Sequence, residues 1–253
     1  MDGYKPPTFE YADFEQEIRA IENLAKNRFL DASAEGVFQR VRDQLRQLRV
    51  GRSNAPTYWQ VDHESPVRTV LTDGYERGQR VGARNVFGEV SWCWQVRNCS
   101  GQGGPAKAFE IIGNASIRLR IVEHAVADTE IARWRVECGA ADSPGCFFHT
   151  QVFGDDHDLL FPKNVPVPRL PTLFVTPMSV IEFFLGELFQ DSWAKRLVGD
   201  DHDLLFWRKN QKRRLKQLLS WKLRQIEACD SGSPWLALKE AKPRTRDTLF
   251  CEE

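Results

Sequence analysis

The sequence predicts an α+β fold: an antiparallel β-meander of about four to six strands, covered by an N-terminal helical hairpin and two C-terminal helices. Three observations support this class. Apolar residues recur every three to four positions in residues 8–50 and 176–227, which is typical of helices with one buried face. Apolar and polar residues alternate over much of residues 57–153, which is typical of half-buried strands. Short turn-rich segments join these strands, which favours antiparallel neighbours.

The length, composition and charge of the chain fit a soluble globular protein. Its 253 residues, 42% of them hydrophobic, support one main domain spanning residues 1–253. Lysine plus arginine and aspartate plus glutamate number 35 each, so no overall charge indicates a surface given over to nucleic acid or membrane. No stretch approaches the roughly 18 apolar residues of a membrane-spanning helix, and the first residues lack the pattern of a signal peptide. We therefore expect a cytoplasmic protein with no membrane contact.

Residues 8–50 are predicted to form a helical hairpin. In DFEQEIRAIENLAKNRFLD, Phe14 and Ile18 begin an apolar row at helical spacing, and Val41 and Leu45 belong to a similar row in VFQRVRDQLRQLRV. The segment DASAEG interrupts the pattern between them and supplies capping side chains. The polar faces carry mixed charge, so we expect both helices to pack on a larger element.

Residues 57–153 are predicted to form the antiparallel sheet. In NVFGEVSWCWQVRN, Trp92 and Trp94 share one face with the neighbouring valines. In EIARWRVEC, Trp134 takes an apolar face while the arginine on either side takes the other. Gly113 interrupts the alternation in AFEIIGNASIRLRIVEH, and we expect a bulge or bend there.

The C-terminal half begins with an extended crossing and continues with helices. Residues 162–177 contain five prolines, so they are predicted to form a loop that crosses one edge of the sheet. Residues 176–227 then form two helices, the first with Thr176 as its N-cap and Pro177 at its first position. We expect the apolar face of that helix to pack on the tryptophan-bearing face of the sheet. Residues 228–253 are predicted to be an irregular tail.

The octapeptide GDDHDLLF occurs twice, at Gly154–Phe161 and Gly199–Phe206. The flanking segments do not recur, so the duplication does not indicate a repeat architecture. The second copy opens the last helix, where Asp200 or Asp201 suits the N-cap. The first copy follows a strand, and its acids and histidine are of the kinds that bind divalent metals or transfer protons. Turn and cap sequences are the main interpretation of both copies, and metal binding or catalysis is the alternative.

A metal-dependent hydrolase is therefore one functional hypothesis. His149 shares a predicted strand face with Gln151, and a histidine there is either a hydrogen-bonded core residue or a base lining a pocket. No C-x-x-C or H-E-x-x-H motif occurs, so we assign no metal ligands and expect no cofactor, with a divalent metal kept as the alternative. The candidate catalytic residues are His149, Asp155, His157 and Asp158.

The segment WRKNQKRRLKQLLSWKLR, residues 207–224, carries eight basic residues and no acid. In one interpretation, Leu215, Leu218, Leu219 and Ile226 turn the apolar side of this helix to the core and its charges are solvated. In the other, the charges contact an acidic protein partner or the phosphates of a nucleic acid. The candidate partner-binding residues are Arg208, Lys209, Lys212, Arg213, Arg214 and Lys216.

The common catalytic fingerprints, among them G-x-S-x-G, the P-loop and the kinase motifs, are missing from the sequence. We therefore predict a non-enzymatic binding or accessory component of a larger protein assembly, whose partner is another protein. The first alternative is a protein that contacts nucleic acid through the basic helix at 207–224. The second is the metal-dependent hydrolase that uses His149 with the Asp/His cluster at 155–158.

Overall fold

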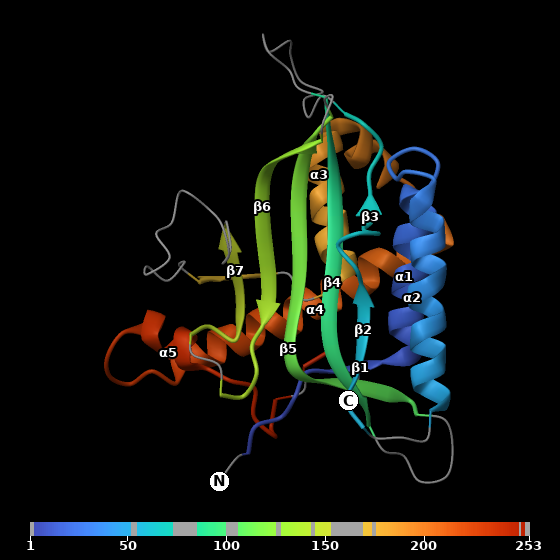
Figure 1. Cartoon of the computed structure of the whole chain (residues 1–253). Coiled ribbons are helices and arrows are strands. Elements are labelled where there is room, and N and C mark those ends of the chain that lie inside the picture. The colour runs from blue at the N-terminus through green and yellow to red at the C-terminus, as the bar shows by residue number, and fades with distance from the viewer. Residues whose placement is uncertain are drawn as a thin grey trace.

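The structure, a computed structural model, describes most of the chain in nine stretches (Figure 1). These are residues 3–51, 55–72, 85–99, 106–124, 128–142, 145–152, 169–173, 176–247 and 249–250. The helices within them are α1 (Tyr11–Ala25), α2 (Ser33–Val50), α3 (Pro177–Arg196), α4 (His202–Glu227) and α5 (Pro234–Glu240). The strands are β1 (Thr8–Glu10), β2 (Thr57–Val61), β3 (Val67–Arg68), β4 (Val86–Asn98), β5 (Ala108–Glu123), β6 (Thr129–Cys138), β7 (Phe148–Val152) and β8 (Leu170–Pro171).

All eight described strands join one antiparallel sheet. Its order is β2-β4-β5-β6-β7-β8, with β1 added to β5 and β3 added to β4. Strands β4 to β7 follow one another along the chain as a meander, which confirms the α+β class and the antiparallel sheet. The strand count exceeds the predicted four to six. Strands β1, β3 and β8 have only two or three residues each, and such short segments contain no readable alternation.

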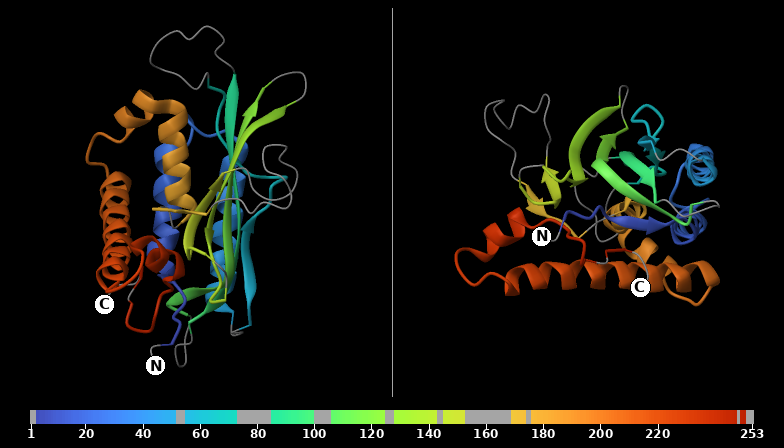
Figure 2. Two further views of the ribbon diagram at one scale, coloured as in Figure 1. Left: turned by 90° about the vertical axis from the view of Figure 1, so that its left-hand side faces the viewer. Right: turned by 90° about the horizontal axis from the view of Figure 1, so that it is seen from below.

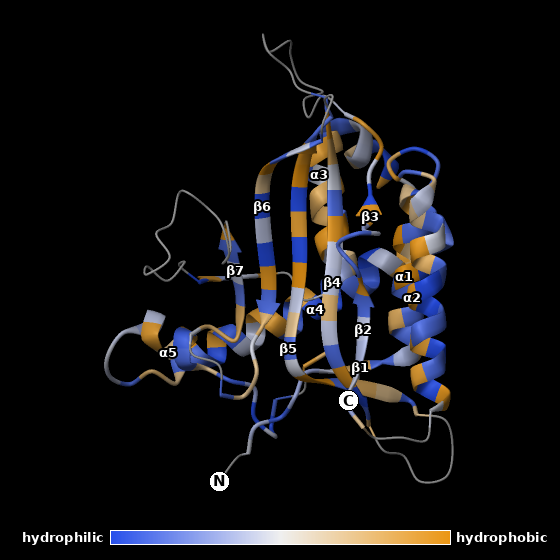
Figure 3. Ribbon diagram, in the orientation of Figure 1, coloured by the Kyte–Doolittle hydropathy of each residue, from blue (hydrophilic) through white to orange (hydrophobic). Residues whose placement is uncertain are grey.

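Helices α3 and α4 lie on the same face of the sheet (Figure 2). Apolar and polar residues alternate along the central strands (Figure 3), and Trp92, Trp94, Ile117 and Leu119 are all buried on the covered side. Because the side chains of a strand point alternately to its two faces, the polar residues between them lie on the opposite, outer face. The sheet therefore has one face in the core and one face that no described helix covers.

Helix α3 packs on β4 as expected, and Gly88 is the point of closest approach. A β-carbon at Gly88 would lie 2.4 Å from Cε1 of Phe184 and 2.7 Å from Cδ1 of Leu188. Both side chains are buried. The missing side chain at Gly88 thus lets the apolar face of the helix rest directly on the strand.

A cluster of aromatic rings joins the N-terminal helical hairpin to the sheet. The ring of Phe14 on α1 lies 5.2 Å from that of Trp59 on β2 and 5.8 Å from that of Trp94 on β4. Trp59 Nε1 donates a hydrogen bond of 3.1 Å to the carbonyl oxygen of Val41 on α2. Phe14 and Val41 are buried, so the apolar spacing of both helices predicted their packed faces correctly.

The interruption expected at Gly113 is a bulge between β4 and β5. Trp94 pairs with Ala115 and Val96 pairs with Ile111, so three residues of β5 lie opposite a single residue of β4. A β-carbon at Gly113 would lie 2.1 Å from Oε1 of Gln95, the residue opposite. Glycine therefore leaves room for that side chain where the ladder is broken.

The two predicted N-caps of the C-terminal helices are confirmed. Thr176 and Ser179 form a capping box at the start of α3, in which Thr176 Oγ1 accepts from the Ser179 amide at 3.2 Å. Asp201 Oδ1 accepts a hydrogen bond of 3.0 Å from the Leu204 amide at the start of α4. The tail was predicted to be irregular, and this is wrong for α5, which begins with a proline in its first turn, a position that suits the fixed φ of proline.

The described end of the proline-rich crossing forms β8, which pairs only with β7 at the edge of the sheet. At an edge, the missing N–H of proline breaks no ladder hydrogen bond. Residues 162–168 and 174–175 of the crossing lie outside the described residues. None of the described helices combines the length and apolarity that crossing a membrane requires.

Candidate functional site

Helix α4 turns a different side to the core from the one that its leucines predict. Leu218 is buried as expected, but Leu215, Leu219 and Ile226 are exposed. The prediction that these four residues form the inward side is therefore wrong for three of them. The residues that α4 buries lie about one turn apart along another side, and two of them are polar: Leu204, Trp207, Asn210, Arg214, Leu218 and Trp221.

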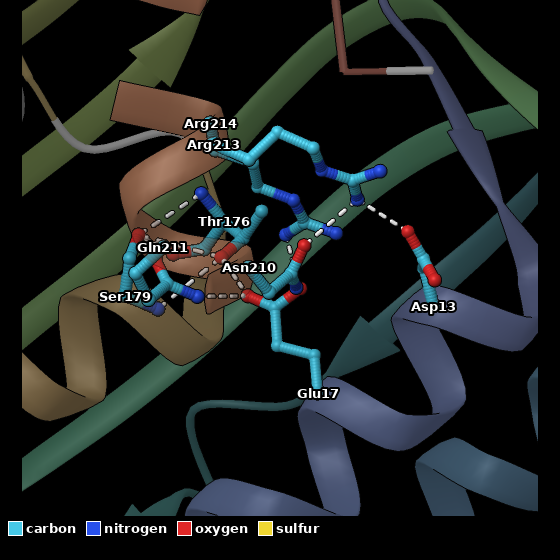
Figure 4. Close-up of polar contacts among 8 residues, drawn as sticks. All are labelled: Asp13, Glu17, Thr176, Ser179, Asn210, Gln211, Arg213 and Arg214. Carbon is cyan, nitrogen blue, oxygen red and sulfur yellow. Dashed lines mark hydrogen bonds and ion pairs between the residues drawn. The ribbon is translucent and has the colours of Figure 1, made fainter. Parts of the chain in front are cut away.

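The reason lies in a buried carboxylate on α1, that of Glu17 (Figure 4). Glu17 Oε1 accepts hydrogen bonds from Thr176 Oγ1 at 2.7 Å and from Gln211 Nε2 at 3.1 Å. Its Oε2 accepts from Asn210 Nδ2 at 3.4 Å and forms an ion pair with Arg214. Through these contacts, Glu17 connects the start of α3 and the middle of α4 to α1.

Arg214 completes this network from α4 and is buried with Glu17. Its guanidinium carbon lies 5.1 Å from the ring centroid of Phe9 and 5.4 Å from that of Phe14, within the range of cation–π attraction. Burial lowers the pKa of Arg214, and the negative charge of Glu17 opposes that change. A buried ion pair that is also hydrogen-bonded fixes orientation, because a rotation of α4 would leave both charges without partners.

The structure separates the six basic candidates into bound and unbound groups. Arg213 forms an ion pair with Asp13, one turn before Glu17 on α1. Arg208 donates hydrogen bonds to the carbonyl oxygens of Leu197 and Gly199 in the α3–α4 connection. Arg214, paired with Glu17, is the third bound candidate. The remaining three are exposed and form no ion pair or hydrogen bond within the described part of the chain: Lys209, Lys212 and Lys216.

An apolar stripe runs along the exposed side of α4. Its members are separated by four, four and three residues, so they lie on one side of the helix. Their exposed fractions range from 37% to 55%. We call this set the apolar stripe: Leu215, Leu219, Leu223 and Ile226.

A groove of about 480 Å³ lies between α3 and α4, beside the apolar stripe. Leu215 belongs to both the stripe and the groove. The exposed side chains of Leu173 and Phe183 also line the groove. Gln190, another lining residue, has φ 39° and ψ −110° and interrupts α3. This backbone conformation is unfavourable for a residue other than glycine.

Glu182 places a carboxyl group in the groove next to the buried network. Burial raises the pKa of Glu182, and the negative charge of Glu17 raises it further, against a hydrogen bond from Trp207 that lowers it. A carboxyl group with a raised pKa is a candidate proton donor. The residues that line the groove with Glu182 include no histidine and no cysteine.

His149 lies on β7 opposite Glu137 of β6 and is buried. Its Nε2 contacts Glu137 Oε2 at 3.0 Å, and its Nδ1 contacts the carbonyl oxygen of Cys146 at 2.8 Å. Both ring nitrogens therefore contact oxygen atoms of neighbouring residues. Burial alone would raise the pKa of Glu137, but the hydrogen bond from His149 and the charge of Arg135 bring it below its ordinary value.

The two copies of the octapeptide differ in what the structure describes. Asp155, His157 and Asp158 of the first copy lie outside the described residues. In the second copy, Asp201 caps α4, and Asp203 Oδ2 accepts a hydrogen bond of 2.9 Å from Asn23 Nδ2 on α1. Among the described residues, no group of three or more histidine, cysteine or acidic side chains is arranged to hold a metal ion.

Sequence reasoning missed Glu17, although a signal for it exists. Glu17 lies three residues after Phe14 and four before Ile21, so helical spacing places its carboxylate on the apolar face of α1. A charged group on such a face requires a buried partner.

Comparison with known proteins finds no family model, no curated protein and no solved structure that matches this chain. The basis for a function is therefore the chemistry and geometry of its own residues.

Proposed function

We propose that the protein is a non-enzymatic component of a larger protein assembly and that α4 docks on a partner protein through the apolar stripe. The exposed stripe is the observation that carries this proposal. A surface helix normally turns such a row toward its own core. Here Asn210 and Arg214 occupy the buried side, and the Glu17 network holds the helix in that orientation.

Burial of the stripe supplies the energy for docking. Apolar surface left in water is unfavourable by about 25 cal/mol per Å². Helical ligands and receptors commonly meet through apolar anchors spaced three and four residues apart, the spacing seen between Leu215 and Ile226. The groove beside Leu215 has the size for one large apolar anchor of the partner.

Charge defines the chemistry of the partner. Lys209, Lys212 and Lys216 lie on the exposed part of the same helix and have no acidic partner in the described ranges. Opposite charges across an interface raise the association rate and select the partner. The proposed partner is therefore a protein segment, helical in form, that carries an apolar side bordered by aspartate and glutamate.

The test is a native complex in which the contact is mapped. Lysine-directed cross-linking of the isolated complex should join the partner to Lys212 or Lys216. The double variant Leu219→Ser/Leu223→Ser should lose that partner, whereas Leu71→Ser should keep it. Leu71 is a matched control because it is an exposed leucine, 50% accessible, that lies outside the C-terminal helices.

Two outcomes would overturn the proposal. One is a partner that remains bound to the double variant, or that cross-links only to surfaces other than α4. The other is a homodimer, detected by light scattering and abolished in the double variant, because the stripe would then be covered by a second copy of this chain. The melting temperature of each variant should match that of the wild-type protein, since the replaced side chains are exposed.

Binding of nucleic acid is a second candidate function, favoured by three lysines within one short stretch of α4 that have no partner among the described residues. Replacement of Lys209, Lys212 and Lys216 by glutamine should weaken binding of a single-stranded RNA oligonucleotide. The slope of log affinity against log salt should fall by about 0.7 for each phosphate that the variant no longer neutralises. Leu219→Ser/Leu223→Ser should leave this binding unchanged, which distinguishes it from protein docking.

The metal-dependent hydrolase has less support among the described residues. Three of its four candidates lie outside them, and both ring nitrogens of His149 are engaged.

A further inference from the structure

The outer face of the sheet carries four arginine side chains on two neighbouring strands. Arg118 and Arg120 lie on β5, and Arg133 and Arg135 lie on β6. The register pairs Arg118 with Arg135 and Arg120 with Arg133. Directly opposite residues on an antiparallel pair have β-carbons about 5 Å apart, and alternate residues along a strand are about 7 Å apart. Four guanidinium groups therefore originate from a small rectangle of backbone.

Glutamates bind the Arg120–Arg133 side of this rectangle. Arg120 forms ion pairs with Glu89 and with Glu130, the latter at 3.4 Å. Arg133 Nε lies 2.7 Å from Glu130 Oε1. Glu89 is buried and also binds Arg68 at 2.6 Å. Two carboxylates thus neutralise most of the charge at this end.

On the other side, Arg118 and Arg135 differ in their contacts. Arg135 Nη2 donates to Gln151 Oε1 at 2.9 Å, and its Nε lies 3.5 Å from Glu137 Oε1. Arg118 makes no hydrogen bond and no ion pair with any described residue. Ser91, its register partner on β4, is a small hydroxyl-bearing residue on the same face.

Arg118 is partly buried and also lies near other positive charges. Burial and the charges of Arg133, Arg135 and Arg120 all lower its pKa, and Glu130 opposes them. Of the four arginines, Arg120, Arg133 and Arg135 each form an ion pair with a glutamate, whereas Arg118 forms none with a described residue. The guanidinium of Arg118 is therefore a partly buried positive charge beside three other cations. An arrangement of this kind is unfavourable for folding unless an anion completes it.

We propose that the outer face of the sheet binds a small phosphate anion, centred on the Arg118 guanidinium with Arg135 beside it. The planar fork of arginine donates two parallel hydrogen bonds to phosphate oxygens, and the positive charges around Arg118 favour a negatively charged ligand. A long nucleic acid fits less well because most of the neighbouring arginines already bind glutamates, whereas such ligands need a row of free cations. The proposal is independent of docking through α4.

Thermal unfolding in inorganic phosphate, with chloride at the same ionic strength as reference, tests the site. A ligand that binds only the folded state raises the melting temperature in a saturable way. We expect phosphate to do so for the wild-type protein. Arg118→Met should weaken the apparent affinity about tenfold or more, because it removes charge-assisted hydrogen bonds. Arg97→Met is the matched control, since Arg97 is an outer-face arginine on β4 that is paired with Glu110.

A second readout separates a binding role from a structural one. In phosphate-free buffer of low ionic strength, Arg118→Met should melt at or above the wild-type temperature, because it relieves repulsion among the arginines. Arg118→Lys keeps the charge but loses the fork, and we expect an intermediate affinity. If Arg118→Met fails to fold, the comparison of Arg118→Lys with the wild-type protein decides the question.

The proposal is overturned if phosphate and chloride raise the melting temperature equally, because the effect would then be general screening. It is also overturned if the wild-type protein, Arg118→Lys and Arg97→Met respond to phosphate with the same apparent affinity.

Discussion

Glu17 and Arg214 form a pair of opposite charges buried among aromatic rings, far from each other in sequence. Removing one partner leaves the other charge desolvated, so Glu17→Gln or Arg214→Met should lower the free energy of unfolding by about 3–5 kcal/mol. Replacing both, as Glu17→Gln/Arg214→Met, should cost less than the sum of the two changes, because neither charge is left alone. Urea denaturation of the four proteins measures this coupling. Additive losses would mean that the pair does not act as a unit.

Glu182 leads to a prediction about how the stability of the protein depends on pH. Its pKa is raised in the folded state, so the folded protein favours the protonated form and loses stability as pH rises above the ordinary range for glutamate, about 4.3. Glu182→Gln should therefore be more stable than the wild-type protein at pH 7, and the difference should vanish below about pH 4. Melting temperatures across this range measure the effect. Glu187→Gln, at an exposed position on the same helix, is the control, and an equal gain there would contradict the assignment to Glu182.

At the scale of elements, the packing of α3 on β4 depends on a glycine and a phenylalanine. Phe184→Ala should lower stability by about 3–5 kcal/mol through reduced burial and a cavity. Gly88→Ala should cost about 1–3 kcal/mol, because the new methyl group meets the Phe184 ring. The combined variant should lose less than the sum, since the smaller residue at 184 makes room for the methyl group.

Gly36→Ala is the control for this pair. Gly36 is exposed on α2, and a β-carbon there meets only Arg40 Nη1 at 3.9 Å. Alanine should therefore stabilise the helix by about 0.5–1 kcal/mol. A loss at Gly36 comparable to that at Gly88 would show that the cost is not steric contact with α3. Calorimetric unfolding of the single and double variants gives all four values.

The same elements show what sequence patterns can and cannot predict. Period-two alternation placed Trp92 and Trp94 in the core, and cap residues located the starts of α3 and α4, because both depend on local chemistry. The orientation of α4 was not predictable from its own residues. Its leucines indicate one buried side, but a carboxylate on α1, nearly 200 positions earlier, selects the side that carries Asn210 and Arg214.

At the scale of the molecule, the four outer-face arginines of β5 and β6 show a second limit of prediction from sequence. The alternating arginines of IRLRIV and RWRV are visible in the sequence, and each pair alone reads as the polar side of a strand. Their juxtaposition depends on the register of β5 against β6, and a slip of one residue would send one pair to the other face. The first copy of the octapeptide, with Asp155, His157 and Asp158, lies outside the described residues and stays a prediction.

Glu17 also joins the two ends of the chain, since α1 comes from the first 25 residues and α3 and α4 from residues beyond 176. We therefore expect that the segments joined by this contact open together in local unfolding, although they are far apart in the sequence. In native-state hydrogen exchange, Glu17→Gln should reduce amide protection in α4 and in the first turn of α3 together. The amides of β4 and β5, which pair with strands on both sides in the centre of the sheet, should keep their protection.

Asp43→Asn is the matched control for this experiment, because Asp43 is an exposed acid on α2 whose ion pair with Arg46 lies at the surface. It should leave exchange in α3 and α4 unchanged, since surface pairs contribute little. Equal loss of protection across helices and sheet in Glu17→Gln would mean that the molecule opens only as a whole. Loss confined to α1 would mean that α4 is held by its apolar contacts at Leu204, Trp207 and Leu218, with the buried charge setting its orientation but not its attachment.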